Sequence, residues 1–126
     1  MSQAGLSTTG EDNGIKKWFE ITVTGPTAMI KDYGYIANTT SPTLCQFTLP
    51  TTADVGSIVA VVGKGTGLFQ IQQGALQQIH YGNLSTTVGP GGSITSTKTH
   101  DRIELLCTTD NTTWTVLSAG AVLNVV

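Results

Sequence analysis

The sequence predicts an all-β protein, a single antiparallel β-sandwich with a jelly-roll-like arrangement of about nine or ten strands. Three observations predict this fold class. Short apolar stretches recur between Gly, Pro, Asn and Asp residues at a spacing of roughly ten residues. Threonine dominates the polar positions, and β-branched residues favour a pleated strand and disfavour a helix. No stretch repeats its apolar residues with the period of an amphipathic helix.

Two parts are expected along the chain of 126 residues. Residues 1–14 are small, polar and without periodicity, which predicts a flexible lead-in or linker. Residues 15–126 suffice for one domain with its own hydrophobic core and are too few for two.

The first half of the domain contains four predicted strand regions. Apolar and polar side chains alternate over residues 19–23. Residues 28–37 predict a second strand or a hairpin, with Gly34 at a bulge or bend. Residues 45–49 place three apolar side chains on one face, and residues 58–62 form the continuous apolar run of a strand covered on both faces.

The second half contains further short strands, expected at 68–72, 76–81, 94–97, 103–107, 114–116 and 122–126. Gly74 is expected in a hairpin turn, and so is the glycine-rich segment 63–67. A phosphate-binding loop would need a different glycine spacing and a helix directly after it. Residues 88–92 are expected to form a loop, and residues 110–111 a turn.

The charge and apolar pattern of the chain argue against nucleic acid and membranes as partners and favour association with further copies of the chain. Charged residues make up 11% of the chain and the formal net charge is −2. Because no basic cluster beyond Lys16-Lys17 is present to neutralise phosphates, nucleic acid is not an expected partner. No apolar run approaches the roughly 18 residues of a membrane-spanning helix, so membrane insertion is not expected. The low charge leaves little repulsion between copies, which favours an oligomer.

Catalysis is not expected, because no group of side chains shows the spacing that catalysis needs. His80 and His100 are far apart in sequence and lack metal-ligand partners at standard spacing. No Ser or Thr stands in a recognisable nucleophile setting. Glu20 and Glu104 fall at outward positions of their strands, where no pairing of the two carboxylates can be inferred. The sequence therefore predicts no enzyme, no cofactor and no metal site.

Aromatic and loop residues are better functional candidates, because aromatic rings stack on sugars or fill subunit interfaces. The candidate glycan or interface contacts are Trp18, Tyr33, Tyr35, Tyr81, Asn83 and Asn111. Ordinary core or rim packing is the competing interpretation for most of the aromatic residues. Trp18 is the strongest interface candidate, whereas Trp114 is expected in the core with Val116 on the same face.

Two cysteines, Cys45 and Cys107, are expected on the inward faces of their strands. One inter-sheet disulfide and two buried free thiols are both consistent with this pattern, because cysteine also packs well as a small hydrophobe.

Two stretches carry a resemblance to a known type of protein: VGSIVAVVGKGTGLFQIQQ at 55–73 and VGPGGSITSTKTHDRIELLCTTDNTTWTVLSAG at 88–120. They resemble a β-rich module of bacteriophage tail fibres and other virion-associated structural proteins, although Phe69 stands where Trp is commoner. Residues 37–50 resemble it only faintly. The resemblance implies a homotrimer carried on a virion, serving as the distal domain that contacts a host cell-surface glycan or protein.

Loops at 38–43, 82–92 and 108–113 are expected to form the exposed ends, since binding residues concentrate on loops held by a rigid scaffold. Two alternatives stay open. One is a carbohydrate-binding module or lectin without a virus, and the other is a capsid decoration protein without a receptor.

Overall fold

The computed structural model describes residues 14–120 and 123–126, and within them the chain contains twelve strands and no helix. The expectation of an all-β protein is therefore confirmed. The predicted lead-in at 1–14 lies outside the described residues except for Gly14. Three of the strands are only two residues long, so the strand number differs from the expected nine or ten mainly through these short pairings.

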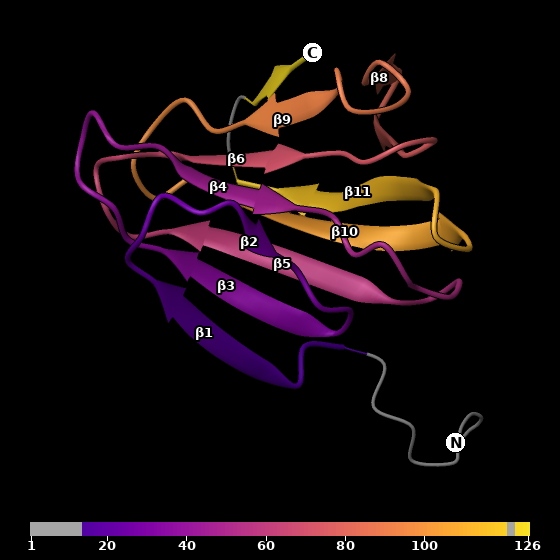
Figure 1. The fold of residues 1–126 in the computed structure, drawn as a ribbon, viewed down its shortest axis with the longest axis horizontal. Helices are drawn as coiled ribbons and strands as arrows, with labels where there is room; N and C mark the ends of the chain where they lie inside the picture. Colours follow the sequence, from indigo (N-terminus) through magenta and orange to yellow (C-terminus); the bar gives the residue numbers. More distant parts are fainter. Residues whose placement is uncertain (1–13, 121–122) are drawn as a thin grey trace.

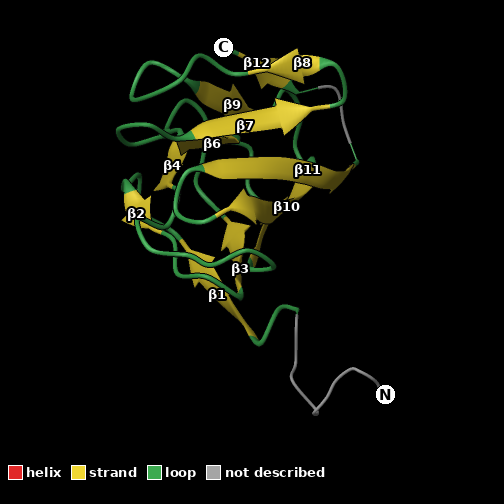
Figure 2. Ribbon diagram, turned by 90° about the vertical axis from the view of Figure 1, so that its right-hand side faces the viewer, coloured by secondary structure: helices red, strands yellow, loops and turns green. Residues whose placement is uncertain are grey.

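Seven strands form the larger sheet, in the spatial order β1 (Lys17–Ile21), β3 (Tyr33–Ala37), β5 (Ile58–Gly63), β10 (Arg102–Thr109), β11 (Thr113–Ala119), β7 (Gln78–Tyr81) and β8 (Leu84–Ser85). Five strands form the smaller sheet, in the order β12 (Asn124–Val125), β9 (Ser93–Thr95), β6 (Phe69–Gln72), β4 (Cys45–Thr48) and β2 (Thr27–Ala28). Figure 1 shows both sets of strands running across the molecule, and Figure 2 shows them as two layers.

Both sheets are mixed, so the expectation of purely antiparallel pairing is wrong. β1, β3 and β5 are parallel neighbours, as are β2, β4 and β6, and β11 is parallel to β7. The reason is that the first seven strands alternate between the two sheets. Two strands of one sheet are therefore separated along the chain by a strand of the other sheet. That intervening strand runs back across the molecule, so the next strand of the first sheet starts from the same end and is parallel to its neighbour.

Both predicted hairpins are therefore crossings between sheets. The segment 63–67 leads from β5 in the larger sheet to β6 in the smaller one, and the Gly74 segment leads from β6 back to β7. Residues 28–37 likewise span the end of β2 and the whole of β3, which belong to different sheets. Gly34 lies inside a continuous β1–β3 register rather than at a bulge.

The connection between β3 and β4 packs against the connection between β5 and β6 through backbone hydrogen bonds. The Gly65 N–H donates to the Ala37 carbonyl (3.0 Å), and the Gly67 N–H donates to the Thr39 carbonyl (3.0 Å). A Cβ atom on Gly65 would lie 2.1 Å from the Thr39 oxygen, so only glycine allows this approach.

One hydrophobic core lies between the sheets and receives alternate side chains from both. Phe47 and Phe69 enter it from the smaller sheet, and Val59, Leu105 and Trp114 enter it from the larger one. All five are fully buried, which confirms the core placement predicted for Trp114.

Cys45 and Cys107 are buried as predicted, and both thiols are free. The Cys45 sulfur lies 3.9 Å from the Ile21 carbonyl oxygen, where β1 ends. The Cys107 sulfur lies 3.8 Å from the Ala53 carbonyl oxygen, in the loop before β5. β1 and β5 run in the same direction, so the end of β1 beside Cys45 lies at the same side of the molecule as the end of β5. Cys107 lies beside the start of β5, so the two thiols are at opposite ends of the sheets.

Candidate binding face

A row of five cross-strand neighbours crosses the larger sheet on the face that points away from the core. In the strand register, Trp18 of β1 pairs with Gly34 of β3, which pairs with Ala60 of β5. Ala60 pairs with Glu104 of β10, and Glu104 pairs with Ser118 of β11. Alternation requires this orientation, since the residues on both sides of Gly34 and Ala60, and Phe19 directly after Trp18, pack into the core.

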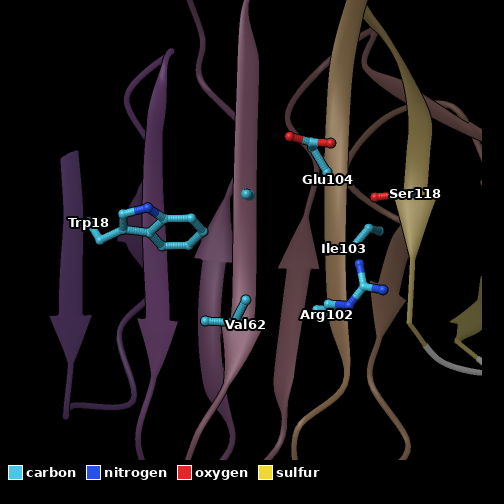
Figure 3. Close-up of a pocket in the computed structure, with 7 residues that line it drawn as sticks. Trp18, Val62, Arg102, Ile103, Glu104 and Ser118 are labelled. Carbon is cyan, nitrogen blue, oxygen red and sulfur yellow. The ribbon is translucent and has the colours of Figure 1, made fainter. Parts of the chain in front are cut away.

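The Trp18 indole lies flat against the sheet because Gly34 has no side chain. A Cβ atom built on Gly34 would lie 2.4 Å from Trp18 Cε3 and 2.6 Å from Cδ2. Figure 3 shows the ring extending from β1 over β3 toward β5. The side chain is 44% exposed, so the sheet supports one face of the ring while the other is open.

Beside the ring, the sheet surface forms a shallow groove of about 180 Å³. Its lining residues are Trp18, Ala60, Val62, Arg102, Ile103, Glu104 and Ser118, hereafter the Trp18 groove. Small residues, Gly34 and Ala60, occupy the middle of the row, which lowers the floor between the indole on one side and Glu104 on the other.

Two groups of opposite charge in the groove have no ionic partner. Within the described part of the chain, neither Arg102 nor Glu104 forms an ion pair or a side-chain hydrogen bond. Glu20, on the same face, is different: Lys64 Nζ lies 3.0 Å from its carboxylate, and that hydrogen bond, with a second from Asn38, holds the pKa of Glu20 below its ordinary value. Glu104 and Arg102 therefore keep their hydrogen-bonding capacity for something else.

The three tyrosines predicted as contacts do not line the Trp18 groove. Tyr35 is 3% exposed, its hydroxyl accepts the Ile30 N–H (2.7 Å), and its ring packs 5.5 Å from Phe47 of the other sheet. Its position contradicts the expectation of a surface contact, because alternation along β3 turns it into the core. Tyr33 is half-buried with its ring edge-on to Phe19, and Tyr81 is half-buried against the core.

The two asparagines differ from each other. Asn83 is exposed in the turn between β7 and β8. The Asn111 side chain accepts the Ala53 N–H (2.8 Å), and its φ of 64° is the left-handed conformation that asparagine tolerates in turns. Asn111 thus stabilises the turn between β10 and β11 and ties it to the loop before β5.

The predicted exposed loops lie at both ends of the molecule. Residues 38–43 follow β3, at the end where β5 also finishes, whereas residues 108–113 connect β10 to β11 at the opposite end. The segment 82–92 begins at the first end and returns to the second, where the Gly89 N–H donates to the Gln77 carbonyl (2.8 Å). These loops therefore do not form one continuous surface.

Other polar pairs in the described residues offer little chemistry. His80 Nδ1 lies 2.8 Å from the Ser85 hydroxyl near the far edge of the larger sheet, with no acidic side chain hydrogen-bonded to the imidazole. His100 contacts the Gly63 carbonyl (3.3 Å), and Asp101 accepts the Thr97 and Lys98 N–H groups. Among residues 14–120 and 123–126, no three metal-binding side chains cluster. None of these residues forms a helix that could cross a membrane.

The sequence singles out Trp18 as an interface candidate, but it does not indicate which residues surround the indole ring. Gly34, Ala60 and Ser118 became relevant only through the register of four strand pairs, which joins positions far apart in the chain. No model of a known protein family matches the chain, and no curated protein sequence matches it significantly.

Proposed function

We propose that this chain is a non-catalytic structural module of a virion, the distal, receptor-contacting domain of a trimeric bacteriophage tail fibre. In this proposal the two mixed sheets form a β-sandwich that acts as a rigid support. Three copies associate, and their outer surfaces meet a glycan or protein on the host cell. The low charge of the chain supports association, and the resemblance of residues 55–73 and 88–120 to fibre modules supports the virion context.

The observation that carries the proposal is the difference between the two ends of the sheets. At one end the loops 38–43, 63–67 and 96–101 expose polar side chains and Pro42. They are joined by hydrogen bonds from Gly67 N–H to the Thr39 carbonyl and from Gly63 N–H to the Asp101 carbonyl (2.8 Å). We call these three loops the polar tip; it is on the left in Figure 1.

The opposite end carries more exposed aliphatic side chains, beside the exposed ion pair of Lys31 with Asp54, although the aliphatic residue Val23 is exposed near the first end. Those at the opposite end belong to the loops before β3, before β5, before β7 and before β9, and are between 55% and 73% exposed: Ile30, Val55, Leu76 and Val88. We call these four residues the apolar end. The first described residues also lie there, since the Lys16 N–H donates to the Asp32 carbonyl just before β3. This polarity is that of a domain attached through an apolar end and presenting a polar tip.

Light scattering of the full chain tests the proposal. We expect a mass three times the 13.2 kDa of one chain, and we expect this mass to stay the same when the protein is diluted. A monomer that persists at high concentration contradicts the fibre module.

The second candidate, a carbohydrate-binding module or lectin without a virus, is favoured by the Trp18 groove. It predicts that a monomer binds sugar as well as any assembly does. A capsid decoration protein differs in location: antibody labelling of particles would place it across a capsid lattice, whereas the proposal places it on tails.

A further inference from the structure

We propose that the Trp18 groove is a sugar subsite that binds one pyranose ring. The apolar face of the ring stacks on the open face of the Trp18 indole, and its hydroxyl groups hydrogen-bond to Glu104 and Arg102. This inference deepens the proposed function by naming the ligand class and the site, and it rests on that function only in taking the chain to act by binding.

The indole provides a platform that is already in place. Aromatic rings carry large apolar area, and a sugar ring presents C–H groups on its faces with hydroxyls around its rim. The Trp18 ring packs directly on the backbone of β3 at Gly34, which limits the rotation of the indole. Little conformational entropy of the Trp18 side chain is therefore lost when a ligand stacks on its open face. Among the exposed large hydrophobic side chains of the described residues, Trp18 is the only aromatic one.

The charged groups beside the platform suit hydroxyl groups. A carboxylate only accepts hydrogen bonds and a guanidinium only donates them, whereas a hydroxyl does both. Glu104 and Arg102 are two residues apart on one face of β10, next to the Ser118 hydroxyl. Neither side chain forms an ion pair or a hydrogen bond with another side chain of the described residues. A phosphate or nucleic acid is disfavoured because Glu104 would repel it, and a purely apolar ligand would leave both charges without partners.

The size of the groove limits the ligand to a single ring. Its volume of about 180 Å³ lies below the roughly 300–1,000 Å³ of sites that enclose drug-sized molecules. One ring on an open sheet binds weakly, in the millimolar range expected for few contacts. Three subsites on one trimer would convert weak contacts into useful avidity.

The two tryptophans make the test direct, because Trp18 is exposed and Trp114 is fully buried. The full chain is titrated with the methyl glycosides of glucose, galactose, mannose, rhamnose and N-acetylglucosamine and applied to a glycan array. In two-dimensional NMR we expect at least one sugar to shift the indole N–H signal of Trp18 saturably and to leave that of Trp114 unmoved. This result supports the subsite.

Four variants separate a binding role from a structural one. Trp18→Ala is expected to weaken binding at least tenfold, with the Trp114 signal reporting that the fold is intact. Trp18→Phe should restore part of the loss, because a ring remains. Glu104→Gln should weaken binding several-fold without changing thermal stability. Leu84→Ala, which removes an exposed apolar side chain at the opposite edge of the same sheet, should change nothing.

Three outcomes would overturn the proposal: no saturable binding by any sugar in the panel or on the array, binding that Trp18→Ala leaves intact, or a Trp18 signal that moves with protein concentration instead of with sugar. The last would mean that another copy of the chain covers this face. A trimer that binds no sugar would contradict the sugar subsite and leave the proposed fibre module unaffected. A monomer that binds sugar would contradict the fibre module and support the subsite.

Discussion

Gln73 is a single buried side chain that joins several loops at the apolar end. The two N–H groups of its Nε2 are shared among the backbone carbonyls of Gln77 (2.7 Å), Thr87 (2.8 Å) and Gly89 (3.0 Å). Its Oε1 accepts the hydroxyl of Thr86. The residue is 5% exposed, so water cannot replace these partners if the side chain is removed.

We expect Gln73→Leu to destabilise the fold strongly. Leaving a buried polar group without a partner costs about 1–3 kcal/mol. The Thr86 hydroxyl and the Thr87 carbonyl lose their Gln73 partner, whereas the Gln77 and Gly89 carbonyls keep backbone N–H donors, so a loss of about 1–3 kcal/mol is predicted. Urea unfolding followed by Trp114 emission measures it. Gln72→Leu is the matched control, because Gln72 is half-buried in β6 and donates only to Gln70 (3.0 Å); a change within about 0.5 kcal/mol is expected there. Equal effects of the two substitutions would contradict this account.

The cysteines give a prediction that depends on protonation. Burial raises the pKa of both Cys45 and Cys107, and only the thiolate reacts with disulfide reagents. At pH 8 the folded protein should therefore react slowly with Ellman's reagent and faster as the pH is raised. Unfolding in guanidinium should release two reactive thiols per chain. If unfolding without reductant releases none, the cysteines form a disulfide and their placement here is wrong.

Among individual residues, alternation along a strand predicted which side chains point inward. It placed Cys45, Cys107 and Trp114 in the core, and the structure agrees. It did not reach Tyr35, because the boundary between β2 and β3 was not recognised in the sequence and the face of β3 could not be assigned. It could not find Gln73 either, since a buried amide is recognised only by the carbonyls that converge on it.

At the scale of elements, the crossings between sheets determine the pairing of strands. A glycine-rich segment between two apolar stretches has the same sequence pattern whether the second strand pairs with the first or enters the other sheet. The segment 63–67 and the Gly74 turn were therefore predicted as hairpins, although both are crossings. What distinguishes them is contact with earlier crossings, such as the backbone of Thr39 and Thr43 against Gly65 and Gly67, which is not local in the chain.

Substitution of one crossing glycine tests this arrangement. In Gly65→Ala the new Cβ would lie 2.1 Å from the Thr39 carbonyl oxygen, and backbone cannot easily move aside. We expect a loss of about 1–3 kcal/mol, as for overpacking, measured by thermal or urea unfolding. Gly91→Ala is the control, because nothing lies within 4 Å of the position and the φ is not left-handed. That change should be neutral or slightly stabilising. A Gly65→Ala protein as stable as Gly91→Ala would mean that the crossings do not pack as described.

The candidate site shows the same limit of sequence reasoning. Trp18 was recognisable as an aromatic residue at the start of a strand, and Glu104 as an outward carboxylate. Their proximity depends on β1, β3, β5 and β10 being neighbours, an order that only the three-dimensional fold supplies. Gly34 had a local signal, a glycine inside a strand, but that signal does not say whether a bulge or a neighbouring ring requires it.

For the whole molecule, the two faces of the larger sheet have different roles. The inner face holds the hydrophobic core around Trp114, and the outer face carries the Trp18 groove. The polar tip and the apolar end add a direction along the strands. A rigid body with one covered face and one open aromatic platform is suited to presenting a surface to a partner.

Acrylamide quenching of tryptophan fluorescence on the unmodified, assembled protein tests most directly whether the larger sheet has one covered and one open face. Trp18 is 44% exposed and Trp114 is 0% exposed, so we predict two populations of emission, one quenched readily and one protected until the protein unfolds. Protection of both tryptophans would show that the outer face is covered, and rapid quenching of both would show that the core is not the one described; either result contradicts the account.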